Sequence, residues 1–294
     1  MALDTTRTPF RTVERVLGGA CSYFSLAANF FTKVYSVSVI GEDFPRAYLE
    51  LLSSKGIDLG NVQRIEGGKT FFYDSTFSFD LYHRQANKTE LNVLAEFDPR
   101  VDGKANESEF LYLATMPPQK QLKTIRQMKG RKLVFMDTIE FYIQSELDGI
   151  KEVMKNVDGV VLNDSEARML AGENNLIKCG KKIQGFGPKI VILKKGEHGS
   201  LLFYDGQVVP FPAYPLEDIS DPTGAGDAFA GGFLGYLARE RAEKPGLNQM
   251  KKAMAYANVM GSLTVEEFSV DGLISASFEK VQKRFEHYSE LLRI

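Results

Sequence analysis

The residues best suited to chemistry form one short segment near the end of the chain, Asp221-Pro222-Thr223-Gly224-Ala225-Gly226-Asp227. A proline-containing turn leads into two glycines, and a long apolar stretch rich in small residues starts immediately afterwards. The pattern predicts a loop that feeds a helix N-terminus, whose first backbone N–H groups have no partner within the helix. Together with the helix dipole, these groups would form a site for an anion.

Asp227 falls in the first turn of the predicted helix, beside this anion site. A carboxylate there can accept the proton of an attacking hydroxyl, while neighbouring amides neutralise charge on a transferred phosphoryl group. The glycines let the backbone approach a phosphate closely. An ordinary helix start would also favour an acid at this position, because of the helix dipole alone. The residues by themselves leave both interpretations open.

The elements that must position this segment follow from the length and the hydrophobic pattern of the chain. A chain of 294 residues with 44% hydrophobic and 25% charged residues is typical of one soluble globular domain. Short apolar runs that suit buried strands alternate with amphipathic stretches that suit helices. Strands are expected at 34–40, 110–114, 132–136, 159–162 and 190–193, and helices at 25–31, 44–54, 119–128, 145–156, 165–171, 225–241, 247–267 and 277–293. This alternation predicts an α/β fold with a mainly parallel sheet sandwiched by helices.

Two stretches break the alternation. Residues 8–17 are short and polar, and residues 62–92 are rich in aromatic and β-branched side chains without helical spacing. We expect them to form antiparallel strands of a small, discontinuous β-sheet lid within a single catalytic domain, 1–294. Only three residues precede Asp4, so a central first strand is expected to be shortened or missing.

Charge and cysteine content restrict the partners and the compartment. A net charge of -2 argues against a nucleic-acid partner, because binding to a phosphate backbone needs clustered positive charge. Cys21 and Cys179 are too few for a disulfide framework or a four-cysteine metal site, which favours a reducing compartment. The N-terminus has no apolar core of a signal peptide, and no apolar run approaches the ~20 residues that span a bilayer. We expect a cytoplasmic protein without a membrane partner.

The string from Asp221 to Phe233, Asp-Pro-Thr-Gly-Ala-Gly-Asp-Ala-Phe-Ala-Gly-Gly-Phe, resembles the C-terminal signature of the ribokinase-like (PfkB) carbohydrate kinase family. In that family the last Asp of the motif is the catalytic base, and the Gly-Ala-Gly amides form the anion hole. The resemblance therefore implies a base at Asp227 and an anion hole at Gly224, Ala225 and Gly226. It also implies a doubly wound, mainly parallel ribokinase-like sheet that carries a small β-lid.

Two further segments resemble the nucleotide side of the family. Asn163-Asp164-Ser165-Glu166 is similar to the Asn-x-x-Glu motif, which influences magnesium and phosphate binding; Glu166 would act on the metal through water. Lys194-Lys195-Gly196 is similar to the turn that approaches the nucleotide. Taken alone, the first segment is an ordinary helix cap and the second a hairpin. The candidate nucleotide-binding residues are Asn163, Glu166, Lys195, Gly196, Thr223 and Asn258.

The acceptor side is carried by residues near the N-terminus. Gly18-Gly19-Ala20 resembles the first signature of the family, whose glycine pair contacts the acceptor, and Asp4 matches the substrate-hydroxyl-binding Asp. The family Asn four positions after the second glycine is replaced here by Tyr23. This side chain would offer an aromatic face to a nucleoside base, or belong to the helix core. The candidate acceptor-binding residues are Asp4, Gly18, Gly19 and Tyr23.

The resemblance implies an ATP-dependent kinase that transfers the γ-phosphate to a hydroxyl of a sugar or nucleoside. ATP and Mg²⁺ would be its cofactors, and a monovalent cation is a further candidate. The aromatic lid invites edge-to-edge pairing in a homodimer. The alternative is a non-catalytic ligand-binding or regulatory protein on a kinase-like scaffold. A vitamin kinase of the same fold is a third class, against which the lid and the Gly18-Gly19 pair argue.

Overall fold

The computed structural model describes residues 1–293, which divide into two compact units. The first unit comprises residues 1–98, 214–240 and the chain from residue 255 onward; the second comprises residues 99–213 and 241–254. The single domain 1–294 and the lid bounds of 8–17 and 62–92 stay predictions. None of the helices within residues 1–293 combines the length and the apolar character that crossing a bilayer requires.

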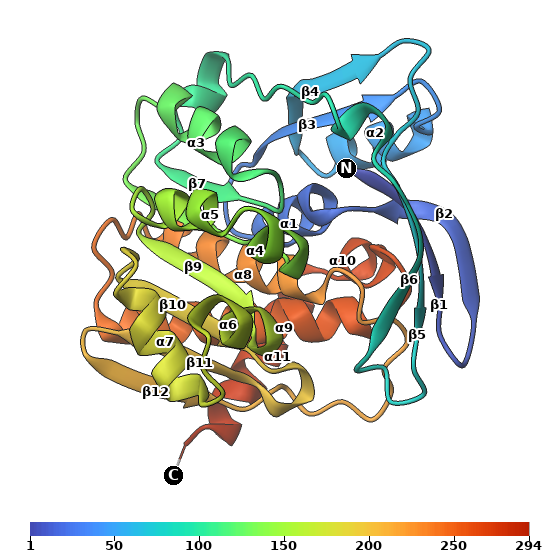
Figure 1. Ribbon diagram of the computed structural model, residues 1–294. Helices are drawn as coiled ribbons and strands as arrows, with labels where there is room; N and C mark the ends of the chain where they lie inside the picture. The colour runs from blue at the N-terminus through green and yellow to red at the C-terminus, as the bar shows by residue number, and fades with distance from the viewer. Residues whose placement is uncertain (294) are drawn as a thin grey trace. The chain divides into compact units, whose positions relative to one another are not determined.

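The second unit contains a six-stranded sheet (Figure 1). Its strand order is β12-β11-β10-β9-β8-β7, with parallel pairing from β7 to β10 and antiparallel pairing from β10 to β12. The four parallel strands confirm the sequence prediction, since each is a short and almost continuously apolar run. The strands are β7 (Phe110–Leu113), β8 (Leu133–Met136), β9 (Gly159–Asn163), β10 (Ile190–Lys194), β11 (Ser200–Tyr204) and β12 (Gln207–Phe211).

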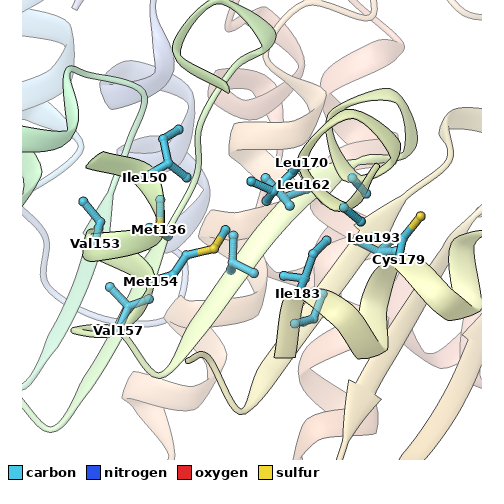
Figure 2. Close-up of a cluster of buried hydrophobic side chains, with 14 of the residues drawn as sticks. Met136, Ile150, Val153, Met154, Val157, Leu162, Leu170, Cys179, Ile183 and Leu193 are labelled. Carbon is cyan, nitrogen blue, oxygen red and sulfur yellow. The ribbon is translucent and has the colours of Figure 1, made fainter. Parts of the chain in front are cut away.

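Helices of the second unit bury the apolar side chains of this sheet, as Figure 2 shows. Ile150 and Met154 lie near Met136 of β8, while Cys179 and Ile183 lie near Leu193 of β10. The helix predicted at 145–156 is present as α5 (Leu147–Met154), and a separate short helix, α4 (Glu140–Ser145), ends directly before Glu146, where φ is -138°. The helices are α3 (Pro118–Gln127), α4 (Glu140–Ser145), α5 (Leu147–Met154), α6 (Asp164–Ala171) and α7 (Leu176–Gln184), with 3₁₀ turns η2 (Gly103–Glu107) and η3 (Gly196–His198).

The first unit contains a four-stranded sheet in the order β2-β1-β5-β6. Its strands are β1 (Ala2–Arg7), β2 (Thr12–Gly18), β5 (Phe72–Phe77) and β6 (Arg84–Glu90). The expectation of a missing first strand is wrong, because β1 has six residues and pairs with β2 on one side and β5 on the other. The β-branched Thr5 and Thr6 continue the strand beyond Asp4, so Asp4 lies inside it rather than at its end.

A second, two-stranded sheet of this unit joins β3 (Tyr35–Gly41) to β4 (Asp58–Ile65). The strand expected at 34–40 is therefore present, but it pairs with β4 and not with the six-stranded sheet. The start of the stretch 62–92 was expected to be antiparallel, whereas β4 runs parallel to β3. The reason is the connection: helix α2 (Arg46–Ser54) crosses between the two strands, as parallel pairing requires.

The helix that follows the glycine-rich segment packs closely against the helix that contains Phe24 and Ala28. A Cβ atom at Gly231 would lie 2.6 Å from the carbonyl oxygen of Phe24, and one at Gly235 would lie 2.9 Å from the Cα of Ala28. Two helices therefore approach each other as closely as only glycine permits. Besides α2, the helices that include described residues of this unit are α1 (Ala20–Ala28), α8 (Ala225–Arg239), α9 (Leu247–Val265), α10 (Asp271–Ser275) and α11 (Phe278–Leu291), with a 3₁₀ turn η1 (Asn92–Leu94).

Gly180 of α7 gives a stability prediction for the second unit. A Cβ atom there would lie 2.3 Å from the ring of Phe203, so Gly180→Ala should destabilise the protein by about 1–3 kcal/mol through overpacking. Gly261→Ala is the matched control, because its nearest atom lies 3.6 Å away and its helix should gain up to about 1 kcal/mol. Thermal unfolding of both variants checks the contrast; equal midpoints would contradict it.

Candidate active site

The loop before α8 is held by a buried carboxylate and by the end of α9. Ser220 and Asp221 donate backbone hydrogen bonds to the carbonyl oxygen of Val265, at 2.8 and 3.3 Å. The Asp221 side chain, only 1% exposed, accepts hydrogen bonds from the backbone N–H groups of Thr223 (2.9 Å) and Ser269 (3.4 Å). Asp221 therefore ties the loop to a second segment of the chain and sets the direction in which α8 begins.

Gly224 is the residue at which the chain turns into α8. Its φ of 77° lies in the left-handed region, and no side chain caps the helix. A Cβ atom at this position would lie 2.3 Å from the ring of Tyr23, which is 1% exposed. Both the backbone angle and the neighbouring ring therefore require glycine here.

The first turn of α8 carries Ala225, Gly226 and Asp227. An α-helix cannot satisfy the N–H groups of its first turn with its own carbonyls, and the helix dipole adds positive potential there. The N–H of Ala225 donates a 3.2 Å hydrogen bond to the carbonyl oxygen of Pro222, in the loop before the helix. All three residues, like Gly224, are partly exposed, whereas the next turn is buried. The helix start is where the sequence predicted it, while the roles of Asp227 as base and of the Gly224, Ala225 and Gly226 amides as anion hole stay predictions.

Asp4 lies against the glycine pair at the end of β2. Its Oδ2 accepts a hydrogen bond from Gly19 N at 3.3 Å, and a Cβ atom at Gly18 would lie 1.9 Å from the same oxygen. Burial raises the pKa of Asp4 to about 6, against the opposing effects of the Gly19 hydrogen bond and of Arg84. The structure thus brings together three of the residues expected on the acceptor side.

A contact joins this acceptor side to the loop before α8. Thr6 and Thr223 share a hydrogen bond between their Oγ1 atoms, which are 3.5 Å apart and buried. Asp4 and Thr6 are two residues apart on β1, so their side chains point to the same face of the sheet. That face therefore carries the acceptor candidate Asp4 and meets the loop that leads to Asp227.

Tyr23 is buried under Gly224, in the position of a helix-core residue. Burial raises the pKa of its hydroxyl, and the nearby carboxylates of Asp4, Asp221 and Asp227 raise it further. The ring thus supports the turn at Gly224 and lies in the electrostatic field of three acids. Direct contact between this ring and a nucleoside base stays a prediction.

Asn163 and Glu166 of the second unit form a reciprocal cap at the start of α6. Asn163 Oδ1 accepts a hydrogen bond from Glu166 N, and Glu166 Oε2 accepts one from Asn163 N, both at 2.8 Å. Glu166 is 7% exposed. Burial raises its pKa, and the neighbouring Asp137 raises it further, against the effect of Lys194. The cap keeps this carboxyl group at the carboxyl end of β9.

Two charged residues of this edge were not among the site residues expected from the sequence. Lys194 Nζ at the end of β10 lies 3.5 Å from Oδ2 of Asp137, which directly follows β8. Tyr112 of β7 donates a 3.0 Å hydrogen bond to the same oxygen. The signal available in the sequence was their position, since open α/β sheets bind ligands at the carboxyl ends of their strands.

The remaining nucleotide-binding candidates lie in two different parts of the structure. Gly196 has φ of 56° and opens the turn between β10 and β11, where Lys195 N donates a 2.8 Å hydrogen bond to Gly199 O. Asn258 lies on α9 and is 7% exposed. Asn163, Glu166, Lys195 and Gly196 belong to the second unit, and the other candidates belong to the first. That the two groups bind one nucleotide stays a prediction.

The arrangement of strands and helices defines an α/β fold of the ribokinase type. A nucleoside kinase of Methanocaldococcus jannaschii, an archaeal member of the ribokinase family, superposes with a TM-score of 0.76 and 19% identity, covering 97% of this chain and 95% of that one. A nucleoside kinase of Burkholderia thailandensis, solved with inosine, has a TM-score of 0.79 and 16% identity, covering 98% and 95%. The predicted fold class is confirmed.

Sequence similarity identifies the family. The family model described as pfkB family carbohydrate kinase matches residues 4–275. A cytidine kinase of Thermococcus kodakarensis is 33% identical over 250 residues, which cover 82% of this chain and 87% of that kinase. The chain belongs to the pfkB family of carbohydrate kinases. It is an ATP-dependent phosphotransferase with an alcohol group of a sugar or nucleoside as acceptor.

Gly224→Ala should reduce kcat by about 100-fold, because the new methyl group would meet the Tyr23 ring and displace the first turn of α8. Gly206→Ala is the matched control: its φ of 71° is similar, but no atom lies within 4 Å of the added Cβ. Steady-state kinetics and thermal unfolding of both variants separate the contact from backbone strain. A Gly224→Ala enzyme with the kcat of Gly206→Ala would contradict the role of the ring.

Asp4→Asn should change how stability depends on pH. In the folded protein Asp4 keeps its proton up to about pH 6, whereas an unfolded aspartate releases its proton near pH 3.8. The parent protein therefore loses stability as the pH rises between these two values. The free energy of unfolding of Asp4→Asn relative to the parent should therefore increase by roughly 2 kcal/mol between pH 4 and 7. Urea unfolding at a series of pH values tests this, and a pH-independent difference would refute it.

Proposed function

We propose that this kinase phosphorylates a hydroxyl group of a nucleoside, with Asp227 as the general base. The observation that carries the proposal is the arrangement within the first unit. Asp227 is partly exposed in the first turn of α8, and the loop before it contacts the sheet face that carries Asp4. A base and an acceptor-hydroxyl ligand are thereby held on connected segments.

The choice of a nucleoside is supported by Tyr23 and by the relatives. Tyr23 replaces the family Asn and brings no amide for hydrogen bonds to sugar hydroxyls. The Thermococcus relative is a cytidine kinase, and the Burkholderia structure holds inosine.

In the proposed reaction each group has a separate task. The Asp227 carboxylate takes the proton of the attacking hydroxyl as the bond between its oxygen and the γ-phosphorus forms, while the bond from the γ-phosphorus to the bridging oxygen breaks and ADP leaves. The amides of Gly224, Ala225 and Gly226 stabilise negative charge on the transferred phosphoryl group. Asp4, mostly ionised at neutral pH, accepts a hydrogen bond from another hydroxyl of the acceptor and fixes its orientation.

The candidates for binding the nucleotide are Asn163, Glu166, Lys195, Gly196, Thr223 and Asn258. Mg²⁺ supplies charge neutralisation at the phosphates when it is bound, and Glu166 would hold it through water. Glu166 is buried and its pKa is raised, so its carboxyl group would take the ionised form that orders metal-bound water when the positive charge of Mg²⁺ is present. A monovalent cation remains a further candidate.

The aromatic residues at the turns of the four-stranded sheet support a homodimer. Phe10, between β1 and β2, is 65% exposed, and Phe79, between β5 and β6, is 82% exposed. Such side chains lose unfavourable contact with water when a second copy covers them. Lid-to-lid pairing of two copies is the proposed use of these residues.

Asp227→Asn should lower kcat by at least about 1,000-fold while ADP still raises the melting temperature, because the amide cannot accept the hydroxyl proton but leaves the anion site in place. Asp271→Asn is the matched control, since Asp271 also lies in the first turn of a helix. ADP release is measured with cytidine, inosine, ribose and fructose as acceptors. Retained turnover in Asp227→Asn would refute the base, and sugar-only turnover by the parent enzyme would refute the nucleoside.

A further inference from the structure

One face of the four-stranded sheet carries more than the acceptor candidate Asp4. In the parallel register of β1 and β5, Asp4 pairs with Tyr73 and Thr6 pairs with Ser75. Paired residues of adjacent strands place their side chains on the same face. Tyr73 therefore shares the face of Asp4 and Thr6, and this is the face that contacts Thr223.

Arg84 of β6 extends over this face. Its backbone pairs with Phe77, but its guanidinium carbon lies 5.0 Å from the centroid of the Tyr73 ring. The side chain thus runs back along the sheet to the row that contains Asp4. A guanidinium over an aromatic ring is held by the cation–π attraction, which keeps its N–H donors in a defined plane. Arg84 is exposed, so these donors are open to a ligand.

The electrostatics of the face restrict the ligand. Burial raises the pKa of Asp4 and the pKa of Tyr23. Arg84 lowers both pKa values, because its positive charge lies close enough to act on both groups. The carboxylates of Asp4, Asp221 and Asp227 act on Tyr23 from the same surroundings. Three acids against one guanidinium and the N-terminal amine leave net negative charge around this face. A neutral acceptor fits there better than one that already carries a phosphate group.

We propose that Arg84, held over the ring of Tyr73, determines acceptor specificity by donating a hydrogen bond to a carbonyl oxygen of a neutral, planar nucleoside base. This proposal rests on the proposed nucleoside kinase function. It specifies the class of base that the enzyme binds and the residue that recognises this base. With the ribose hydroxyl at Asp4, the base extends along the sheet towards Tyr73 and Arg84. Cytidine, uridine and inosine carry the required carbonyl group, and adenosine does not.

Arg84→Met tests the assignment, because it keeps the length of the side chain and removes the donors and the charge. We expect KM for cytidine to rise about 10- to 100-fold, the loss typical of one hydrogen bond to a charged group. We expect kcat, KM for ATP and the melting temperature to stay within about twofold of the parent values. Arg46→Met is the matched control, since Arg46 is an exposed arginine of α2 that pairs with Glu50. Tyr73→Leu removes the platform and should raise KM for cytidine in the same direction.

The outcomes separate this inference from the proposed function. Phosphorylation of cytidine by the parent enzyme with an unchanged KM in Arg84→Met would overturn the role of Arg84 and leave the nucleoside kinase intact. A parent enzyme that phosphorylates no nucleoside would overturn both. An equal rise in KM for cytidine and for adenosine in Arg84→Met would show that Arg84 does not recognise the carbonyl group. A loss confined to sugar phosphates would assign the guanidinium to an acceptor phosphate and refute recognition of a base.

Discussion

The backbone turn at Gly224 is the constraint on which the active-site arrangement depends. Its left-handed conformation is cheap only for glycine, and the Tyr23 ring beneath it leaves no space for a side chain. Asp221 fixes the residues before the turn, and the close contact of α8 with α1 fixes the helix after it. The direction of the first α8 amides, and with it the place of Asp227, follows from these contacts.

Buried acids recur in both units and have the same physical consequence. Asp4 and Glu166 are both taken out of water, which raises the pKa of each and favours the protonated form. Both are oriented by backbone N–H groups, from Gly19 and Asn163 respectively. The hydrogen bonds offset part of the cost of burial and hold the carboxyl groups in one orientation. A carboxylate that is costly to bury and precisely oriented is typical of a ligand-binding position.

The four-stranded sheet connects acceptor recognition to the catalytic segment. Its central strand β1 presents Asp4, contacts the loop through Thr6 and pairs with β5, whose Tyr73 supports Arg84. A change of register by one residue would turn all of these side chains to the opposite face. The pairing of β1 with β2 and β5 therefore governs which side chains an acceptor meets.

The helix start at Gly224–Asp227, a helix cap at Asn163 or Asp164 and the four parallel strands could be predicted from the sequence, because turn residues, caps and apolar runs are local signals. The partner of β3, the choice of Asn163 as the cap and the full length of β1 could not be predicted, since they depend on which segments meet in space. The burial of Tyr23 under Gly224 and the position of Arg84 over Tyr73 join residues far apart in the chain. These contacts follow from the tertiary structure alone, because register and packing, unlike spacing, are properties of the folded chain.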